Sequence, residues 1–98
     1  MNPNAAEVLL KLRENMPILR KKYSVKALEL FGSFVKGQQK GESDIDILVE
    51  FVKPIDLFTF VELGELLSEV LGRKVDLVMK DTLKPRIKER ILRETIPV

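Results

Sequence analysis

Two aspartates that stand two positions apart, Asp44 and Asp46, are the residues of this chain best placed to do chemistry. The run Ser43 to Phe51 (SDIDILVEF) is rich in Ile and Val and predicts a strand, so both carboxylates leave the same face of it. Like charges this close either raise a pKa or bind a cation. Asp76 is another Asp inside an apolar run, because it stands in the middle of Lys74 to Met79 (KVDLVM). Three carboxylates could therefore converge on one face of a sheet.

Converging carboxylates are hard oxygen ligands of the kind that Mg²⁺ or Mn²⁺ prefers. Two such ions can clamp the attacking and leaving oxygens of a phosphoryl displacement. The alternative is purely structural: Asp44 caps a turn, Asp46 pairs with a nearby Lys, and Asp76 faces solvent. On the Asp-x-Asp spacing alone this structural alternative is favoured, because such short patterns often arise by chance.

The Gly32-Ser33 pair upstream changes this balance. It follows Lys26 to Phe31 (KALELF), whose alternation predicts a strand that ends in a tight turn, and it precedes a short helical turn over Phe34 to Lys40. Backbone N–H groups and a Ser hydroxyl at such a helix start can bind a phosphate, and Gly32 allows close approach. An ordinary strand-ending turn is the alternative. Because the aspartate strand comes next, a phosphate at the turn would face metals on that strand.

The remaining elements must position these residues. Apolar residues recur at three and four from Asn4 to Tyr23 and predict an amphipathic helix, which Pro17 should kink or divide. Leu57 to Leu71 predicts a core helix that Asp56 caps and Gly72 ends. A helix of this length between two strands favours a right-handed crossover with the strands parallel. We therefore expect the fold class α/β (α+β), with one layer of sheet and a few helices.

The composition of the 98 residues excludes several function classes. Without Cys or His there is no thiol nucleophile, thiolate zinc site or histidine base, so oxygen must hold any metal. The formal charge of +2, from 17 basic and 15 acidic residues, does not favour nucleic acid as a partner. No apolar run approaches the roughly 20 residues of a membrane span, and the N-terminus does not resemble a signal peptide. We therefore expect one cytoplasmic domain over residues 1–98, with no membrane association.

With these residues assembled, a family resemblance becomes visible. The chain resembles the DNA polymerase β nucleotidyltransferase superfamily, whose signature is Gly-Ser, a spacer and Asp-x-Asp, over the segments GSFVKG (32–37) and SDIDILV (43–49). Its flanking strands and order of elements are similar to the minimal nucleotidyltransferase branch, and the resemblance covers nearly the whole chain. The resemblance implies a polymerase β-like nucleotidyltransferase fold, which is a small mixed sheet flanked by helices. For the site, it implies a set of metal-binding catalytic carboxylates, Asp44, Asp46 and Asp76, and a phosphate-binding set, Gly32, Ser33 and Lys36. The family often has Arg at the last of these positions, so a phosphate contact and a solvated side chain both stay open for Lys36.

The resemblance also implies a reaction. An acceptor hydroxyl attacks the α-phosphorus of a nucleoside triphosphate such as ATP, and pyrophosphate leaves, with Mg²⁺ as cofactor and Mn²⁺ as the alternative. Members of the branch are similar to antitoxins encoded beside a HEPN-domain toxin, some of which move AMP from ATP to a Tyr of that toxin, and we expect the same role here. A second hypothesis is a module that neutralises its partner by contact alone. A third, transfer to a small molecule, needs a substrate domain that only a dimer could form, so a homo-oligomer stays open.

Two further stretches bear on partners. The middle helix is apolar over more than one face, which suits either a second chain or packing under loops, because of Leu57, Phe58, Phe60 and Val61. The last segment, Pro85 to Thr95, predicts an element that packs Ile87 and Ile91 on one face, with Leu92 as a further candidate, under many Lys and Arg side chains. Such basic stretches are usually solvated helix faces, so RNA is not expected to bind there.

Overall fold

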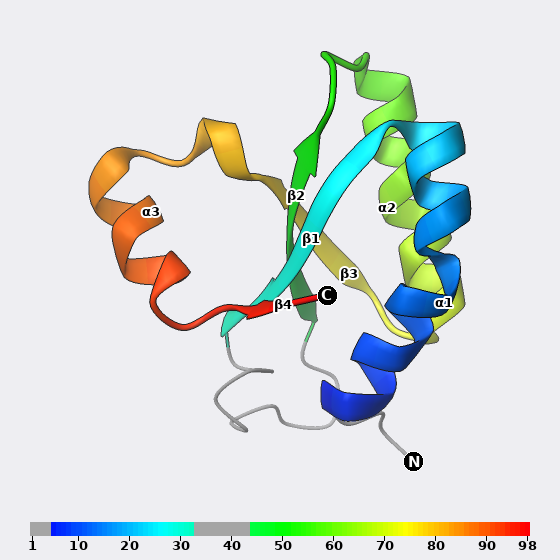
Figure 1. The fold of residues 1–98 in the computed structure, drawn as a ribbon, viewed down its shortest axis with the longest axis horizontal. Helices are drawn as coiled ribbons and strands as arrows, with labels where there is room; N and C mark the ends of the chain where they lie inside the picture. Colours follow the sequence, from blue (N-terminus) through cyan, green and yellow to red (C-terminus); the bar gives the residue numbers. More distant parts are fainter. Residues whose placement is uncertain (1–4, 33–43) are drawn as a thin grey trace.

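The computed structural model describes residues 5–32 and 44–98, apart from the side chains of residues 88, 90 and 92. Helices and strands follow in the order α1 (Ala5–Tyr23), β1 (Val25–Phe31), β2 (Ile45–Phe51), α2 (Leu57–Leu71), β3 (Val75–Met79), the 3₁₀ turn η2 (Lys80–Thr82), α3 (Pro85–Leu92) and β4 (Ile96–Pro97) (Figure 1). The expected short helix over residues 34–40 lies outside the described residues. None of the helices in the described part is long and apolar enough to cross a membrane.

The four strands form one mixed sheet in the order β3-β2-β1-β4. β1 runs antiparallel to both β2 and β4, while β2 and β3 run parallel and are joined by α2. The prediction that the α2 crossover joins parallel strands is therefore confirmed. The mixed sheet with flanking helices is also the fold class that the sequence predicts.

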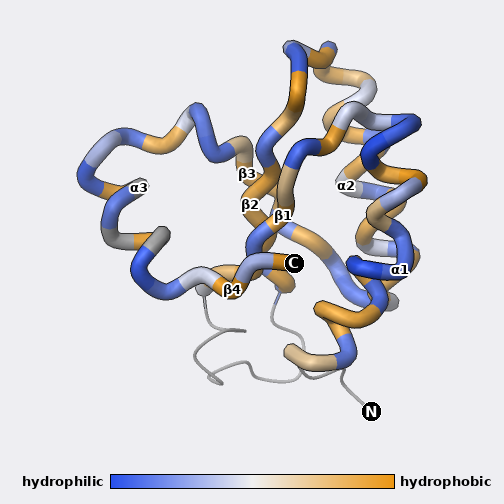
Figure 2. The backbone as a smooth tube through the Cα atoms, viewed as in Figure 1, coloured by the Kyte–Doolittle hydropathy of each residue, from blue (hydrophilic) through white to orange (hydrophobic). Residues whose placement is uncertain are grey.

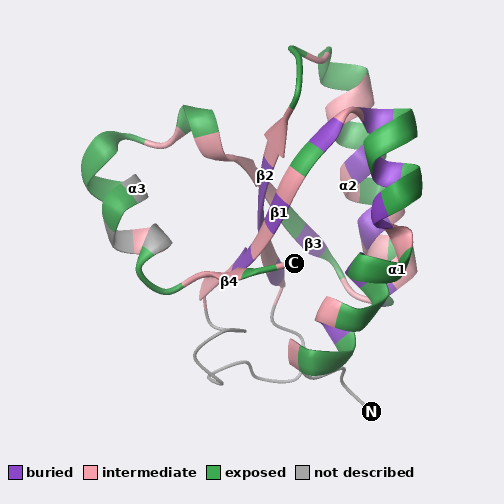
Figure 3. Ribbon diagram, viewed as in Figure 1, coloured by how far each residue is buried: buried purple, intermediate pink, exposed green. Residues whose placement is uncertain are grey.

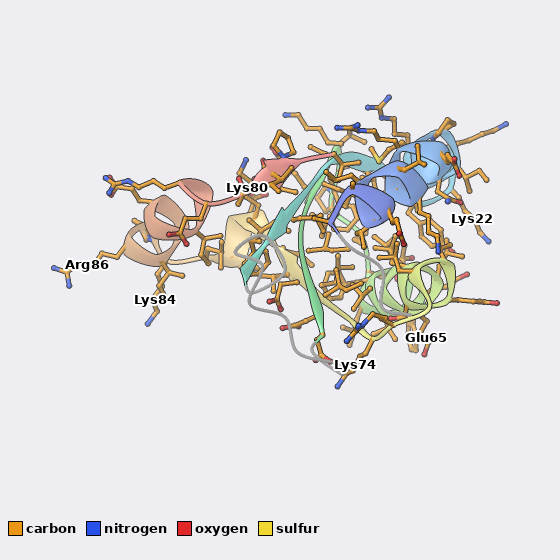
Figure 4. All side chains as sticks on the ribbon, turned by 90° about the horizontal axis from the view of Figure 1, so that it is seen from below. Lys22, Glu65, Lys74, Lys80, Lys84 and Arg86 are labelled. Atoms are coloured by element: carbon orange, nitrogen blue, oxygen red, sulfur yellow. The ribbon has the colours of Figure 1, made fainter. Side chains whose placement is uncertain are left out.

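One face of the sheet is covered by α1 and α2, which lie side by side, whereas α3 stands on the other side (Figures 1 and 4). Hydrophobic and hydrophilic residues alternate along α1 and α2, and their buried positions face the strands (Figures 2 and 3). Strand residues on this covered face, such as Ile45, Ile47 and Val49, are almost fully buried against helix residues such as Leu12 and Leu63. Because alternate strand residues point to opposite faces, Asp46 lies on the face away from these two helices.

Helix α1 continues through Pro17 as a single helix, so of the predicted kink or division the division is wrong. Proline removes one backbone donor and crowds the preceding turn, which favours a break. Here the residues on both sides of the proline, Met16 and Leu19, are buried in the core. Their burial holds both halves on the same sheet face and offsets the lost hydrogen bond.

Helix α2 begins and ends where the sequence predicts. The backbone N–H of Thr59 donates to the Asp56 carboxylate at 2.7 Å, which is a standard N-cap contact. Gly72 ends the helix in the left-handed region at φ +69°. In the last turn of α2, the Ser68 hydroxyl accepts the Val75 N–H at 3.0 Å and so ties the start of β3 to the helix.

We expect Gly64→Ala to stabilise the protein by about 1 kcal/mol. Gly64 lies inside α2, and a Cβ added there would meet no atom within 4 Å. The substitution therefore lowers the entropy of the unfolded chain without creating a clash. Thermal unfolding measures the effect, and an unchanged or lowered midpoint would show that α2 is packed more closely at this position.

The C-terminal segment differs from its prediction. Helix α3 forms, but Ile87 is about half exposed, and none of the described α3 side chains belongs to the buried core. The prediction that Ile87 packs against the rest of the protein is therefore wrong, because α3 stands away from the sheet (Figure 3). After α3 the chain returns to pair β4 with β1, and the Val98 N–H donates to the Leu28 carbonyl at 2.9 Å. This strand was not predicted.

Candidate active site

Asp46 and Asp76 occupy paired positions on neighbouring strands. The parallel register of β2 and β3 places Asp46 beside Asp76, and it places Phe31 of β1 on the other side of Asp46. In-register positions on adjacent strands put the Cβ atoms about 5 Å apart. The α2 crossover therefore brings together two carboxylates that are distant in the sequence, as predicted.

Asp44 lies just before β2, and its carboxylate pairs with Lys74. Its Oδ2 lies 3.9 Å from the Lys74 Nζ; the Lys74 side chain is largely exposed, and that of Asp44 is 42% exposed. The structural alternative paired a Lys with Asp46, but among the described side chains, which leave out residues 88 and 90, no cation lies within ion-pair distance of Asp46. Of the three aspartates, only Asp44 has an ion pair among the described residues, and Asp46 and Asp76 have none.

Burial and the two neighbouring aspartates make the charge on Asp46 costly. Burial, then the charge of Asp76, then that of Asp44, raise the pKa of Asp46 from 3.8 to about 6. Each of these causes disfavours the ionised form. A proton or a bound cation would relieve the same cost, so the site has an affinity for positive charge.

Gly32 lies against this carboxylate. The residue has φ +78°, and a Cβ added to it would collide with the Asp46 carboxylate and come within 3.1 Å of its carboxyl carbon. The left-handed backbone conformation favours glycine at this position, and a larger residue would push the Asp46 carboxylate aside. The other two expected phosphate-binding residues, Ser33 and Lys36, lie outside the described residues.

The donor chemistry of the three aspartates fits a divalent cation such as Mg²⁺. Within the described ranges no group of three or more His, Cys, Asp or Glu side chains is gathered tightly enough to hold a metal. In this structure the Asp44 carboxylate pairs with Lys74. An exposed pair of this kind contributes less than about 1 kcal/mol, so Asp44 can leave Lys74 at little cost.

Three charged residues on the same sheet face were not singled out by the sequence. Lys80 Nζ lies 3.3 Å from Glu29 Oε1 and 3.8 Å from Glu50 Oε1, and all three side chains are mostly buried. Alternation along SDIDILVEF places Glu50 on the side of Asp44 and Asp46. The pairing of Lys80 with Glu29 depends on a contact that crosses β2, from the end of β3 to β1. No local sequence pattern predicts such a contact.

We expect Asp46→Asn to stabilise the metal-free protein by about 1 kcal/mol above pH 6, after allowance for solvent screening of a partly exposed group. The folded-state pKa of Asp46 is about 6 against 3.8 for the free side chain. The folded protein therefore binds the extra proton, and the stability linked to it is complete below pH 3.8 and lost as the pH rises through about 6. Denaturant unfolding of both proteins from pH 4 to 8 measures the difference, which should vanish near pH 4. A constant difference over this range would contradict the raised pKa.

Comparison with known proteins shows which family the chain resembles. The family model described as nucleotidyltransferase domain matches residues 12–98. The protein adenylyltransferase MntA of Thermococcus cleftensis is 46% identical over 80 residues, which are 82% of this chain and 81% of that protein. A solved structure described as a candidate minimal nucleotidyltransferase has 34% identity and a TM-score of 0.80, and covers 100% of this chain and 97% of that chain. A solved toxin–antitoxin structure with AMP-PNP has 27% identity and a TM-score of 0.70, and covers 97% of this chain and 72% of that chain.

Proposed function

Because the chain belongs to the nucleotidyltransferase domain family, we propose that it moves AMP from ATP to a hydroxyl group of a protein partner. The observation that carries this proposal is the pairing of Asp46 with Asp76 beside Gly32. Two carboxylates in register on parallel strands, next to a turn that favours glycine, suit a nucleotide and its cation. The Thermococcus cleftensis relative, which is named a protein adenylyltransferase, supports a protein as the acceptor.

The proposed mechanism rests on the position of each carboxylate. Asp44, Asp46 and Asp76 would hold Mg²⁺, which when bound neutralises the charge of the phosphates. Asp76 is exposed at the edge strand β3, so an acceptor hydroxyl can reach its carboxylate and give up a proton to it. The acceptor oxygen then bonds to the α-phosphorus while the bond to pyrophosphate breaks. Gly32, with Ser33 and Lys36 beyond it, would bind the β and γ phosphates of the leaving group.

We propose further that the partner is a HEPN-domain toxin and that this protein is its cytoplasmic antitoxin, acting as a single domain. The solved toxin–antitoxin structure with AMP-PNP, at 27% identity, supports such a pairing of nucleotide and partner. In this proposal the toxin presents the Tyr hydroxyl that accepts AMP.

The proposal is tested with purified protein, ATP labelled at the α-phosphate, Mg²⁺ and the product of the neighbouring gene. We expect label on the partner, and we expect none with ATP labelled at the γ-phosphate, because pyrophosphate leaves. Chelation of divalent cations should abolish the labelling. Absence of α-label on the partner under all conditions would overturn the proposal, as would full labelling by the Asp44→Asn, Asp46→Asn double variant.

A second candidate function, neutralisation of the partner by contact alone, is favoured by one surface. At the start of α2, Leu57 is 72% and Phe58 is 86% exposed, so the expectation of aromatics packed under loops is wrong for Phe58. Exposed apolar side chains of this size are typical of protein interfaces. Calorimetry with ATP and Mg²⁺ separates the two functions, because a contact module should show no metal-dependent nucleotide binding. Phe58→Asp should weaken partner binding whether the protein transfers AMP or acts by contact alone. Any loss of AMP transfer in this variant should follow from the weaker binding.

A further inference from the structure

Lys80 crosses the sheet on the face that carries the aspartates. It follows directly after β3, yet its Nζ lies 3.3 Å from Glu29 of β1 and 3.8 Å from Glu50 of the intervening strand β2. Only 22% of its side chain is exposed, against 17% for Glu29 and 27% for Glu50. In Figure 4, Lys80 lies in the middle of the molecule near the sheet, whereas Lys84 and Arg86 extend from α3 into solvent.

Leu48 is buried on the face of the sheet that the Lys80 side chain crosses. Leu48 pairs with Glu29 and with Val78 on the face away from α1 and α2, and it does not belong to the core under those helices. It is nevertheless 1% exposed. A Lys80 side chain that reaches from β3 to Glu29 passes over the β2 position between them, so its aliphatic stem helps to cover Leu48. The contact thus joins three strands through charge and through packing.

Strand β3 needs such a contact because it forms an edge of the described sheet. It is five residues long, and its start is held by the bond from Val75 N–H to the Ser68 hydroxyl. Lys80 holds its other end. Asp76 lies between these two anchors, so the position of its carboxylate beside Asp46 depends on both of them.

We propose that Lys80 is a positioning residue for Asp76, which it holds in place by tying β3 to β1 and β2 through Glu29 and Glu50. The expected effect on the transfer rate rests on the proposed function, whereas the contact that holds β3 does not. The tie also balances charge: Lys80 and Lys26 together match Glu29 and Glu50, and Lys26 Nζ lies 3.4 Å from Glu50 Oε2. Without Lys80, two mostly buried carboxylates would share one exposed cation on the face that already carries three aspartates.

The test compares Lys80→Met, which keeps much of the stem over Leu48 but loses the charge, with Lys80→Arg, which keeps the charge. Lys26→Met is the matched control, because Lys26 pairs with the same Glu50 but lies on β1 and is 60% exposed. Amide hydrogen exchange of residues 75–79 is measured in the free protein. We expect exchange about tenfold faster in Lys80→Met, with little change in Lys80→Arg or Lys26→Met.

Transfer kinetics supply the readout that a purely structural role would not move. For Lys80→Met we expect kcat to fall about tenfold while the KM for ATP stays near that of the wild type, with recovery in Lys80→Arg. Wild-type exchange rates of residues 75–79 in Lys80→Met would overturn the tie, whatever the transfer assay gives. Faster exchange with an unchanged kcat would overturn the positioning role. If the wild-type protein transfers no AMP, the proposed function fails, and the exchange rates still decide whether Lys80 holds β3.

Discussion

Asp46→Asn is expected to lower the rate of AMP transfer by at least about a hundredfold while leaving the protein folded. Burial, and then the charges of Asp76 and Asp44, raise the pKa of Asp46, and a divalent cation would relieve the cost of its negative charge. Asparagine keeps the shape of the side chain but removes one negative charge and one good metal ligand. The same change relieves repulsion in the metal-free protein, so the variant should be more stable at pH 7 and less active at once.

Because Asp46→Asn should be more stable but less active, a loss of AMP transfer cannot be explained by unfolding. A transfer assay with labelled ATP gives the rate, and thermal unfolding on the same preparation excludes loss of fold. Asp81→Asn serves as the control, because Asp81 is an exposed carboxylate in η2 that is not among the three aspartates of the candidate site. Equal transfer by wild type and Asp46→Asn would remove Asp46 from the proposed mechanism.

The part of the site that could be predicted from the sequence is the part with local signals. Asp56 and Gly72 define the bounds of α2 by cap chemistry, and a helix of that length between two apolar runs predicts the parallel pairing of β2 with β3. From this pairing it follows that Asp76 lies near Asp46. The residue of the site farthest along the chain was therefore predictable because a short-range pattern determines a long-range contact.

The features that escaped prediction are decided by tertiary contacts alone. Pro17 favours a helix break, but the burial of Met16 and Leu19 outweighs its local preference. β4 has only two residues, one of them Pro97, and forms because the chain after α3 returns to an open edge of β1. The pairing of Glu29 with Lys80 likewise follows from the strand order and has no signal in either segment.

Gly32→Ala is expected to lower AMP transfer by about a hundredfold, because it moves the Asp46 carboxylate. The alanine Cβ would occupy the space of that carboxylate, and β2 holds the Asp46 backbone in register with β1 and β3, so the side chain must rotate away. The left-handed backbone conformation at φ +78° adds a cost of about 1 kcal/mol in stability. A displacement of about 1 Å in a metal ligand is sufficient for a loss of this size.

Gly72→Ala separates the two effects of the Gly32 substitution. Gly72 has a similar left-handed conformation at φ +69°, but a Cβ added there would meet no atom within 4 Å. We therefore expect both variants to lose about 1 kcal/mol of unfolding free energy and only Gly32→Ala to lose transfer activity. Unfolding curves and transfer rates of the two variants, measured side by side, test this. Similar losses of activity in both would mean that backbone strain, and not the contact with Asp46, makes glycine necessary at position 32.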